Sequence, residues 1–218
     1  MKLLFIGNSY TFFSDMPELF RKLAEENSKE LEVYSVTKGG RKLVSFLDAE
    51  DEYTVKLEKL LAENSFDTVI LQDNSTVSLL DRDAFNSGVT YLAERFKALG
   101  ARVILYETWG RKDGSPTLDE HGWTHDGMSE AVAHAYADVA RELNIEVSRA
   151  GAAFHYALRH FPDIDIYNPD KTHPSYVGSC LIAMKHYETV YGEPPEKSDT
   201  LSLDSATLDA FRETLSAI

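Results

Sequence analysis

The hydrophobic residues of the chain fall into short apolar runs separated by longer stretches with helical spacing. Continuous apolar runs at residues 3–6 and 68–71 predict strands that are covered on both faces of a sheet, and residues 102–106 predict a further strand. An alternating pattern at 31–37 and the short segment 145–147 predict two more strands. Successive strands are far enough apart for the crossover helices that parallel pairing requires. The pattern therefore predicts a central parallel sheet of about five strands.

Apolar residues between the predicted strands recur three and four positions apart, which is typical of amphipathic helices. The first helix is expected to begin with Asp15 as its capping residue, Pro17 in the first turn and Glu18 three residues after the cap. Further helices are predicted at about 53–64, 83–99, 128–143, 150–161 and 174–191. The alternation predicts an α/β fold with helices on both faces of the sheet.

Two segments fall outside this alternation. Residues 112–126 are polar and too long for a plain connector, so we interpret them as a functional loop or lid. Residues 193–218 contain one amphipathic segment around Phe211 and are expected to pack on the rest as a C-terminal extension. Because no repeat or linker interrupts the chain, we predict a single domain spanning residues 1–218.

The charge balance narrows the range of partners. The chain of 218 residues has 22 Lys+Arg and 36 Asp+Glu, and its formal net charge of -14 repels nucleic acids and anionic membranes. No apolar run approaches the ~18 residues of a membrane span, and none near the amino terminus resembles a signal peptide. The single cysteine, Cys180, has apolar neighbours and is expected to be buried. We expect a cytoplasmic monomer or homodimer with no nucleic-acid or membrane partner.

Polar or flexible residues follow each of the first four predicted strands. Ser9 follows the first strand, Gly39 and Gly40 follow the second, Asn74 follows the third, and residues 109–111 follow the fourth. The carboxyl ends of parallel strands share one edge of a sheet, where open α/β proteins bind their ligands. We therefore expect these residues to meet at one site.

A later segment supplies the partners that a serine nucleophile needs. Asp170 and His173 are three residues apart, just before the last long helix. A histidine can accept the proton of a serine hydroxyl, and a carboxylate can fix the tautomer of that histidine. Backbone N–H groups at Ser9 and Gly40 and the side-chain amide of Asn74 could stabilise the resulting oxyanion.

Together these motifs resemble blocks one, two, three and five of the SGNH (GDSL-type) hydrolase superfamily. The matching residues are 7–11, 39–40, Asn74 and 170–174, so the resemblance covers residues 1 to about 191. It implies a flavodoxin-like, three-layer α/β/α sandwich that hydrolyses esters. It also implies roles for particular residues: Ser9 as nucleophile, His173 as base, Asp170 as the group that orients it, and Ser9, Gly40 and Asn74 as the oxyanion hole.

The chain departs from the family pattern at two places. Asn8 stands where the family usually has aspartate, and Gln72-Asp73-Asn74-Ser75 replaces the usual Gly-x-Asn-Asp. Either Asn74 or Gln72 could therefore present its amide to the oxyanion, and the register favours Asn74. Both Asn8 and Gln72 are also candidate substrate contacts.

Other candidates surround the same edge. Trp109 is either a buried anchor or a stacking surface for substrate, and Arg111 either binds an anionic group of the substrate or forms an ordinary ion pair. His121 and His125 lie four residues apart beside acidic residues, but the intervening Gly122 and the lack of a regular helix disfavour a metal site. We expect no metal and no cofactor.

The favoured function is a serine esterase that acts on small O-acyl groups, with acetylated carbohydrates as a candidate class of substrate. The alternative is a non-catalytic carbohydrate- or ligand-binding domain that keeps the fold. A flavodoxin-like nucleotide binder is disfavoured because no glycine-rich phosphate loop follows the first strand.

Overall fold

Five parallel strands form the centre of the computed structural model, which describes residues 1–218. The strands lie in the order β2-β1-β3-β4-β5, and their bounds are β1 (Lys2–Gly7), β2 (Glu32–Thr37), β3 (Thr68–Leu71), β4 (Arg102–Tyr106) and β5 (Glu146–Ser148). This order confirms the predicted parallel sheet. The chain adds β2 on one side of β1 and β3 on the other, which creates a switch point where open α/β sheets form their binding crevices.

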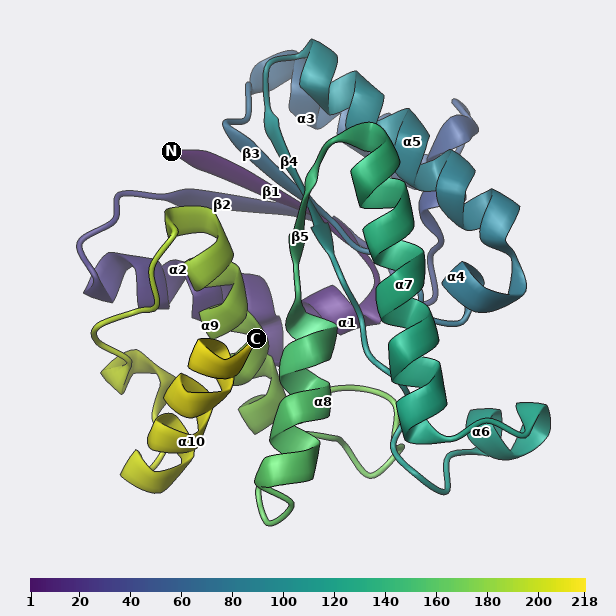
Figure 1. Cartoon of the computed structure of the whole chain (residues 1–218). Helices are drawn as coiled ribbons and strands as arrows, with labels where there is room; N and C mark the ends of the chain where they lie inside the picture. Colours follow the sequence, from purple (N-terminus) through teal and green to yellow (C-terminus); the bar gives the residue numbers. More distant parts are fainter.

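Helices cover both faces of the sheet (Figure 1). The α-helices are α1 (Ser9–Phe12), α2 (Met16–Glu26), α3 (Glu52–Glu63), α4 (Val77–Leu80), α5 (Arg82–Ala98), α6 (Pro116–His121), α7 (His125–Leu143), α8 (Ala150–His160), α9 (Tyr176–Tyr191) and α10 (Ser205–Ala217). Three short 3-10 helices complete the chain: η1 (Phe13–Asp15), η2 (Leu43–Leu47) and η3 (Asp199–Leu201). The arrangement confirms the three-layer, flavodoxin-like α/β/α sandwich.

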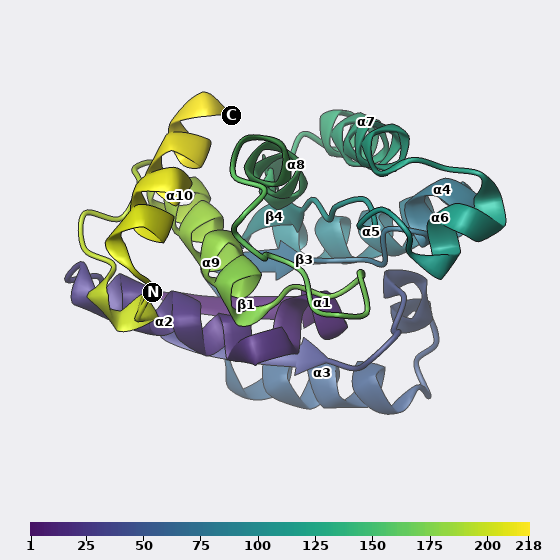
Figure 2. The same ribbon diagram turned by 90° about the horizontal axis from the view of Figure 1, so that it is seen from below.

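Each face of the sheet has its own hydrophobic core, because successive side chains of a strand point to opposite faces. Phe5 and Tyr106 pack on one side with α2, α8, α9 and α10, whereas Ile6 and Leu105 pack on the other with η2, α3, α5 and α7. The two groups of helices lie on different sides of the strands in the view from below (Figure 2).

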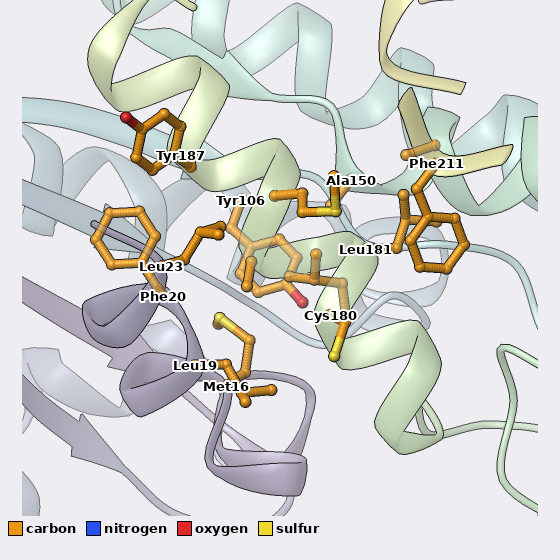
Figure 3. Packing of buried hydrophobic residues seen from close by; sticks show 14 of the residues in the cluster. Met16, Leu19, Phe20, Leu23, Tyr106, Ala150, Cys180, Leu181, Tyr187 and Phe211 are labelled. Carbon is orange, nitrogen blue, oxygen red and sulfur yellow. The ribbon is translucent and has the colours of Figure 1, made fainter. Parts of the chain in front are cut away.

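The first core joins segments that are distant in the sequence. Side chains of α2 face those of α9 around the ring of Tyr106 (Figure 3). Cys180 of α9 is free and buried there, as expected. The C-terminal segment packs on the same core, where Leu201 and Phe211 are fully buried and α10 contacts α8.

The start of the first long helix differs from the prediction. Asp15 forms no capping hydrogen bond, and it adopts a left-handed conformation with φ 52°, as does Ser14 with φ 53°. The reason is that α1 begins directly after β1, so the chain turns a second corner before α2 can start at Met16. Such conformations are costly for residues other than glycine and persist where surrounding structure enforces them.

Two further boundaries are corrected. Residues 112–126 are not an irregular loop, because they contain α6, which is capped by Ser115 and anchored by the buried Leu118. The last long helix begins at Tyr176 with Ser175 as its cap, so Pro174 precedes it. None of the helices is both long enough and apolar enough to cross a membrane.

Candidate active site

Ser9 lies at the point where β1 turns into α1. Gly7 ends the strand and Asn8 caps the helix by accepting a hydrogen bond from the Tyr10 N–H. A Cβ atom on Gly7 would lie 2.5 Å from Gln72 Oε1 and 2.6 Å from Thr11 Oγ1, so only glycine fits this close approach. The turn therefore places the Ser9 hydroxyl at the carboxyl edge of the sheet, as predicted.

The structure brings Ser9, His173 and Asp170 into one hydrogen-bonded chain. Ser9 Oγ lies 2.8 Å from His173 Nε2, and His173 Nδ1 lies 2.6 Å from Asp170 Oδ2. Because a carboxylate accepts hydrogen bonds, the imidazole proton belongs on Nδ1, which leaves the lone pair of Nε2 for the serine hydroxyl. This geometry is that of a nucleophile, its base and the group that orients the base.

Asp170 is held by its own loop. Besides the imidazole, it accepts hydrogen bonds from the backbone N–H groups of Thr172 and His173 at 3.0 and 2.9 Å. Partial burial raises the pKa of Asp170, but the hydrogen bonds from His173 and Thr172 outweigh it, and the pKa lies below its ordinary value. The carboxylate is therefore ionised at neutral pH, as the orienting role expected of it requires.

Aromatic rings fix the plane of the His173 imidazole. The Phe13 ring stacks on it with centroids 4.2 Å apart and planes 6° apart, and the Tyr10 ring lies 5.4 Å away. Phe13 directly precedes the two left-handed residues that form the corner before α2. Sequence reasoning missed this contact, because the chain turn that presents Phe13 to the histidine carries no glycine to signal it.

Three hydrogen-bond donors near Ser9 have no partner within the protein. The backbone N–H groups of Ser9 and Gly40 donate to no protein atom. Asn74 Oδ1 accepts bonds from the Thr76 N–H and hydroxyl at 2.9 and 2.7 Å, which directs its Nδ2 to the opposite side, where it donates to nothing. Gly40 has φ 68°, a conformation that favours glycine. These are the three donors that the resemblance implies for an oxyanion hole.

Gln72 supports the Ser9 turn and is not available to the oxyanion or to substrate. Its side chain is fully buried, and Nε2 donates both hydrogens, to Asn8 Oδ1 at 3.0 Å and to the Asp73 carbonyl at 2.7 Å. Its Oε1 accepts bonds from the Asn8 N–H and the Thr11 hydroxyl, both at 2.8 Å. With no free donor, Gln72 cannot serve the oxyanion, and the predicted contact of Gln72 with substrate is wrong.

The same network explains why asparagine occupies position 8. Asn8 is 1% exposed, and its Nδ2 donates to the Arg41 carbonyl at 2.9 Å while its Oδ1 accepts from Gln72. A carboxylate would lack the donor for Arg41 and would place a charge in a buried site. The predicted contact of Asn8 with substrate is therefore wrong. Its amide instead ties the Ser9 turn to the loop that carries Gly40.

Trp109 and Arg111 lie under the site. Trp109 is fully buried, stacks on Phe154 at 4.0 Å and donates from Nε1 to the Thr172 carbonyl at 3.1 Å, so of its two predicted roles it has that of a buried anchor and not that of a stacking surface for substrate. Arg111 forms no ion pair, because it is buried with its guanidinium 5.2 Å from the centre of the Tyr10 ring. Burial lowers its pKa to about 10, and attraction to Tyr167 and Asp170 offsets this in part. A contact between Arg111 and an anionic group stays a prediction.

A buried carboxyl group beside the oxyanion donors was missed from the sequence. Asp73 is fully buried, and its two oxygens accept bonds from the backbone N–H groups of Asn74 at 2.7 Å and Leu43 at 3.2 Å. Burial raises its pKa to about 7, although these bonds and Lys42 oppose the shift. An acidic residue two positions after the end of a buried strand was the available signal. Asp73 links the Asn74 turn to the start of η2.

The histidine pair considered for a metal does not come together. His121 stacks on Trp123 with ring centroids 4.6 Å apart, whereas His125 is buried and faces His155 of α8. His125 Nδ1 lies 2.9 Å from the Arg111 carbonyl. Burial lowers the pKa of His125, so this ring is neutral at neutral pH.

Comparison with known proteins places this chain in a family. A protein from Slackia heliotrinireducens that is assigned to the SGNH hydrolases shares 30% sequence identity, with a TM-score of 0.78, and the match covers 87% of this chain and 98% of that one. The chain therefore belongs to the SGNH hydrolase superfamily, which confirms the resemblance of its motifs. No family model and no curated protein matches the chain.

More distant structures share the fold. A DUF4886 family protein from Bacteroides uniformis is 16% identical with a TM-score of 0.82, and the match covers 99% of this chain and 93% of that one. An acetyl xylan esterase from Geobacillus stearothermophilus is 17% identical with a TM-score of 0.66, over 90% of this chain and 97% of that one. The architecture is thus common to all three, with only the first similar in sequence.

Proposed function

We propose that this SGNH hydrolase is a serine esterase that removes small O-acyl groups, with acetylated carbohydrates as the candidate class of substrate. The observation that carries the proposal is the hydrogen-bonded chain from Ser9 through His173 to Asp170. The acyl class is supported by the similar fold of an acetyl xylan esterase.

The first half of the reaction forms an acyl-enzyme. Ser9 Oγ attacks the carbonyl carbon of the ester while His173 Nε2 takes the hydroxyl proton, and Asp170 stabilises the imidazolium that results. The carbonyl oxygen becomes an oxyanion that the free donors of Ser9, Gly40 and Asn74 stabilise. The bond to the alcohol oxygen then breaks, and His173 returns the proton to the departing alcohol.

The second half regenerates the enzyme. Water attacks the acyl carbon, His173 takes a proton from that water, and the same three donors stabilise the second oxyanion. The bond between the acyl carbon and Ser9 Oγ breaks, and the proton returns to Ser9. The carboxylic acid leaves, so the net reaction consumes one water molecule for each ester cleaved.

A row of aromatic rings beside the base supports a ring-shaped alcohol. Phe12 is 39% exposed and lies 6.0 Å from Phe13, with their ring planes 24° apart, and Phe13 in turn stacks on His173. The row extends from solvent to the imidazole that protonates the leaving alcohol. An apolar face of a sugar ring could lie along Phe12 while its ester oxygen approaches His173.

The test is to replace Ser9 and follow both turnover and covalent labelling. Ser9→Ala should abolish hydrolysis of p-nitrophenyl acetate, and a fluorophosphonate should add its mass to the unmodified protein at Ser9 but should not label Ser9→Ala. Ser87→Ala, an exposed serine on α5, is the matched control and should retain both properties. Undiminished turnover by Ser9→Ala would reject the nucleophile. A folded wild-type protein that neither turns over nor labels would support the non-catalytic binding domain.

A further inference from the structure

Three side chains with metal-ligating atoms meet where α7 packs on α8. His125 and Asp126 open α7, and His155 lies in the middle of α8. One ligand atom of each residue lies within 4.8 Å of the other two. His125 Nε2 is 3.4 Å from His155 Nδ1, which is 3.8 Å from Asp126 Oδ1. None of the three belongs to the proposed triad.

The protein fixes the tautomer of the buried histidine. His125 Nδ1 lies 2.9 Å from the carbonyl oxygen of Arg111, and a carbonyl can only accept a hydrogen bond. The ring proton therefore belongs on Nδ1, and the lone pair of Nε2 faces His155 and Asp126 as well as the Ser129 hydroxyl, whose oxygen lies 3.4 Å away. Histidines that bind metals are oriented in this way, by donating the opposite N–H to a carbonyl or carboxylate.

We propose that His125 Nε2, His155 Nδ1 and Asp126 Oδ1 bind a divalent first-row transition metal ion, with Zn²⁺ as the favoured ion. Imidazole and carboxylate ligands suit Zn²⁺, and tetrahedral Zn–N bonds of 2.0–2.1 Å separate two ligand nitrogens by about 3.3 Å. The observed separation of 3.4 Å between the histidine nitrogens already matches that spacing. Asp126 and His155, which are not buried, need only small side-chain movements to complete the set.

The surroundings leave room for a further ligand and tune the affinity. A pocket of about 350 Å³ is lined by residues that include Asp126, Ser129 and His155, so solvent can reach a fourth coordination position. Arg159 pairs with Asp126, which orients the carboxylate but also places a positive charge beside the ion. Arg159→Gln should therefore bind the metal more tightly than the unmodified protein.

A bound ion would join α7 to α8 at a point that supports the active-site loop. The Arg111 carbonyl holds His125, and the next residue, Lys112, donates its N–H to the Lys171 carbonyl at 2.9 Å. Lys171 lies between Asp170 and His173. The expected consequence is a rise in thermal stability on binding, because a ligand that binds only the folded state stabilises it.

The experiment titrates the metal-free full chain with Zn²⁺ by calorimetry and with Co²⁺ by visible absorption. We expect one ion per chain, absorption bands of tetrahedral Co²⁺ and a higher Tm. His155→Gln should weaken binding at least about tenfold, since even residues that only orient a ligand contribute that much. His160→Gln, an exposed histidine on the same helix, is the matched control and should bind as the unmodified protein does.

Two outcomes would overturn the proposal: no stoichiometric binding by the unmodified protein, or equal losses in His155→Gln and His160→Gln. His155 is partly exposed, so its replacement should leave the fold intact, which circular dichroism can check; Asp126→Asn provides a second test if it does not. Because binding is measured directly, its failure is independent of any failure of the proposed esterase activity.

Discussion

Replacing Asn8 by aspartate restores the residue that the family usually carries, yet we expect it to destabilise this chain. Asn8 is buried, and its Nδ2 is the donor for the Arg41 carbonyl at 2.9 Å. In Asn8→Asp, a carboxylate oxygen would take the place of that donor and face the carbonyl oxygen. Two acceptors in contact repel each other. The substitution therefore removes a hydrogen bond and buries a negative charge beside the negative end of the Arg41 carbonyl dipole.

The size of the effect follows from these two losses. Leaving a buried polar group without its partner costs about 1–3 kcal/mol. Burial of the ionised carboxyl disfavours its charged form and should raise its pKa, and a tenfold change in its acid dissociation constant corresponds to ~1.4 kcal/mol. We expect Asn8→Asp to lower the free energy of unfolding by about 3 kcal/mol at pH 8. For a domain of this size, that is a fall in Tm of roughly 6–12 °C.

The pH dependence distinguishes this explanation from a general loss of packing. A carboxyl whose pKa is raised in the folded state favours folding below its unfolded pKa, and this contribution is lost as pH rises through the folded pKa. The protonated carboxyl can also donate to Arg41, so the deficit of Asn8→Asp should shrink to about 1 kcal/mol at pH 5.

Urea unfolding at pH 5 and pH 8 measures both values. Asn144→Asp adds the same charge at an exposed helix end and should cost less than about 1 kcal/mol at either pH. Equal stability of Asn8→Asp and wild type at pH 8 would refute the reasoning, as would a deficit that does not change with pH.

Two more predictions concern the turn after β3. Asn74→Ala removes one proposed oxyanion donor and should lower kcat for p-nitrophenyl acetate ~10²–10³-fold, while the loss of its two bonds to Thr76 should lower Tm by only a few degrees; a loss of kcat below threefold would exclude the role. Burial raises the Asp73 pKa from 3.8 to about 7, so the folded state holds a proton that the unfolded chain releases over this range. Asp73 therefore contributes stability that is lost as pH rises from about 4 to 7, and Asp73→Asn should remove this contribution, which changes the slope of stability against pH by up to ~1.4 kcal/mol per pH unit in urea titrations. An identical slope in the two proteins would refute the role of Asp73.

The sheet, the shared edge of its strand ends and the pairing of Asp170 with His173 followed from local patterns, whereas the contact of Ser9 with His173, 164 positions away, was implied by the family resemblance. Buried parallel strands carry continuous apolar runs, and their carboxyl ends share one edge, so residues directly after the strands had to lie near one another. The spacing of Asp170 and His173 needed only a short turn, which the structure provides through hydrogen bonds from Thr172 and His173 to the carboxylate. These features depend on contacts that are near in sequence or repeated by the strand pattern.

Contacts between distant segments determined which side chains of the site are buried and which partner each hydrogen-bond donor has. Gln72 and Asn74 both carry side-chain amides just after the third strand, so the sequence does not distinguish them. Gln72 Nε2 donates both of its hydrogens, to Asn8 and to the Asp73 carbonyl, whereas Asn74 Nδ2 donates to no protein atom. The bond between Gln72 and Asn8 joins residues 64 positions apart. A pattern of residue types does not reveal which partner an amide will find across such a distance.

The sequence by itself determined the α/β architecture, the strand ends that supply the site and the residues able to form a nucleophile, a base and its orienting acid. Only the tertiary structure decided that Asn8, Gln72 and Trp109 support the site from beneath and that His125 faces His155 rather than His121. The physical reason is that periodicity reports which face of an element is buried, whereas hydrogen-bond partners are chosen by how the elements pack.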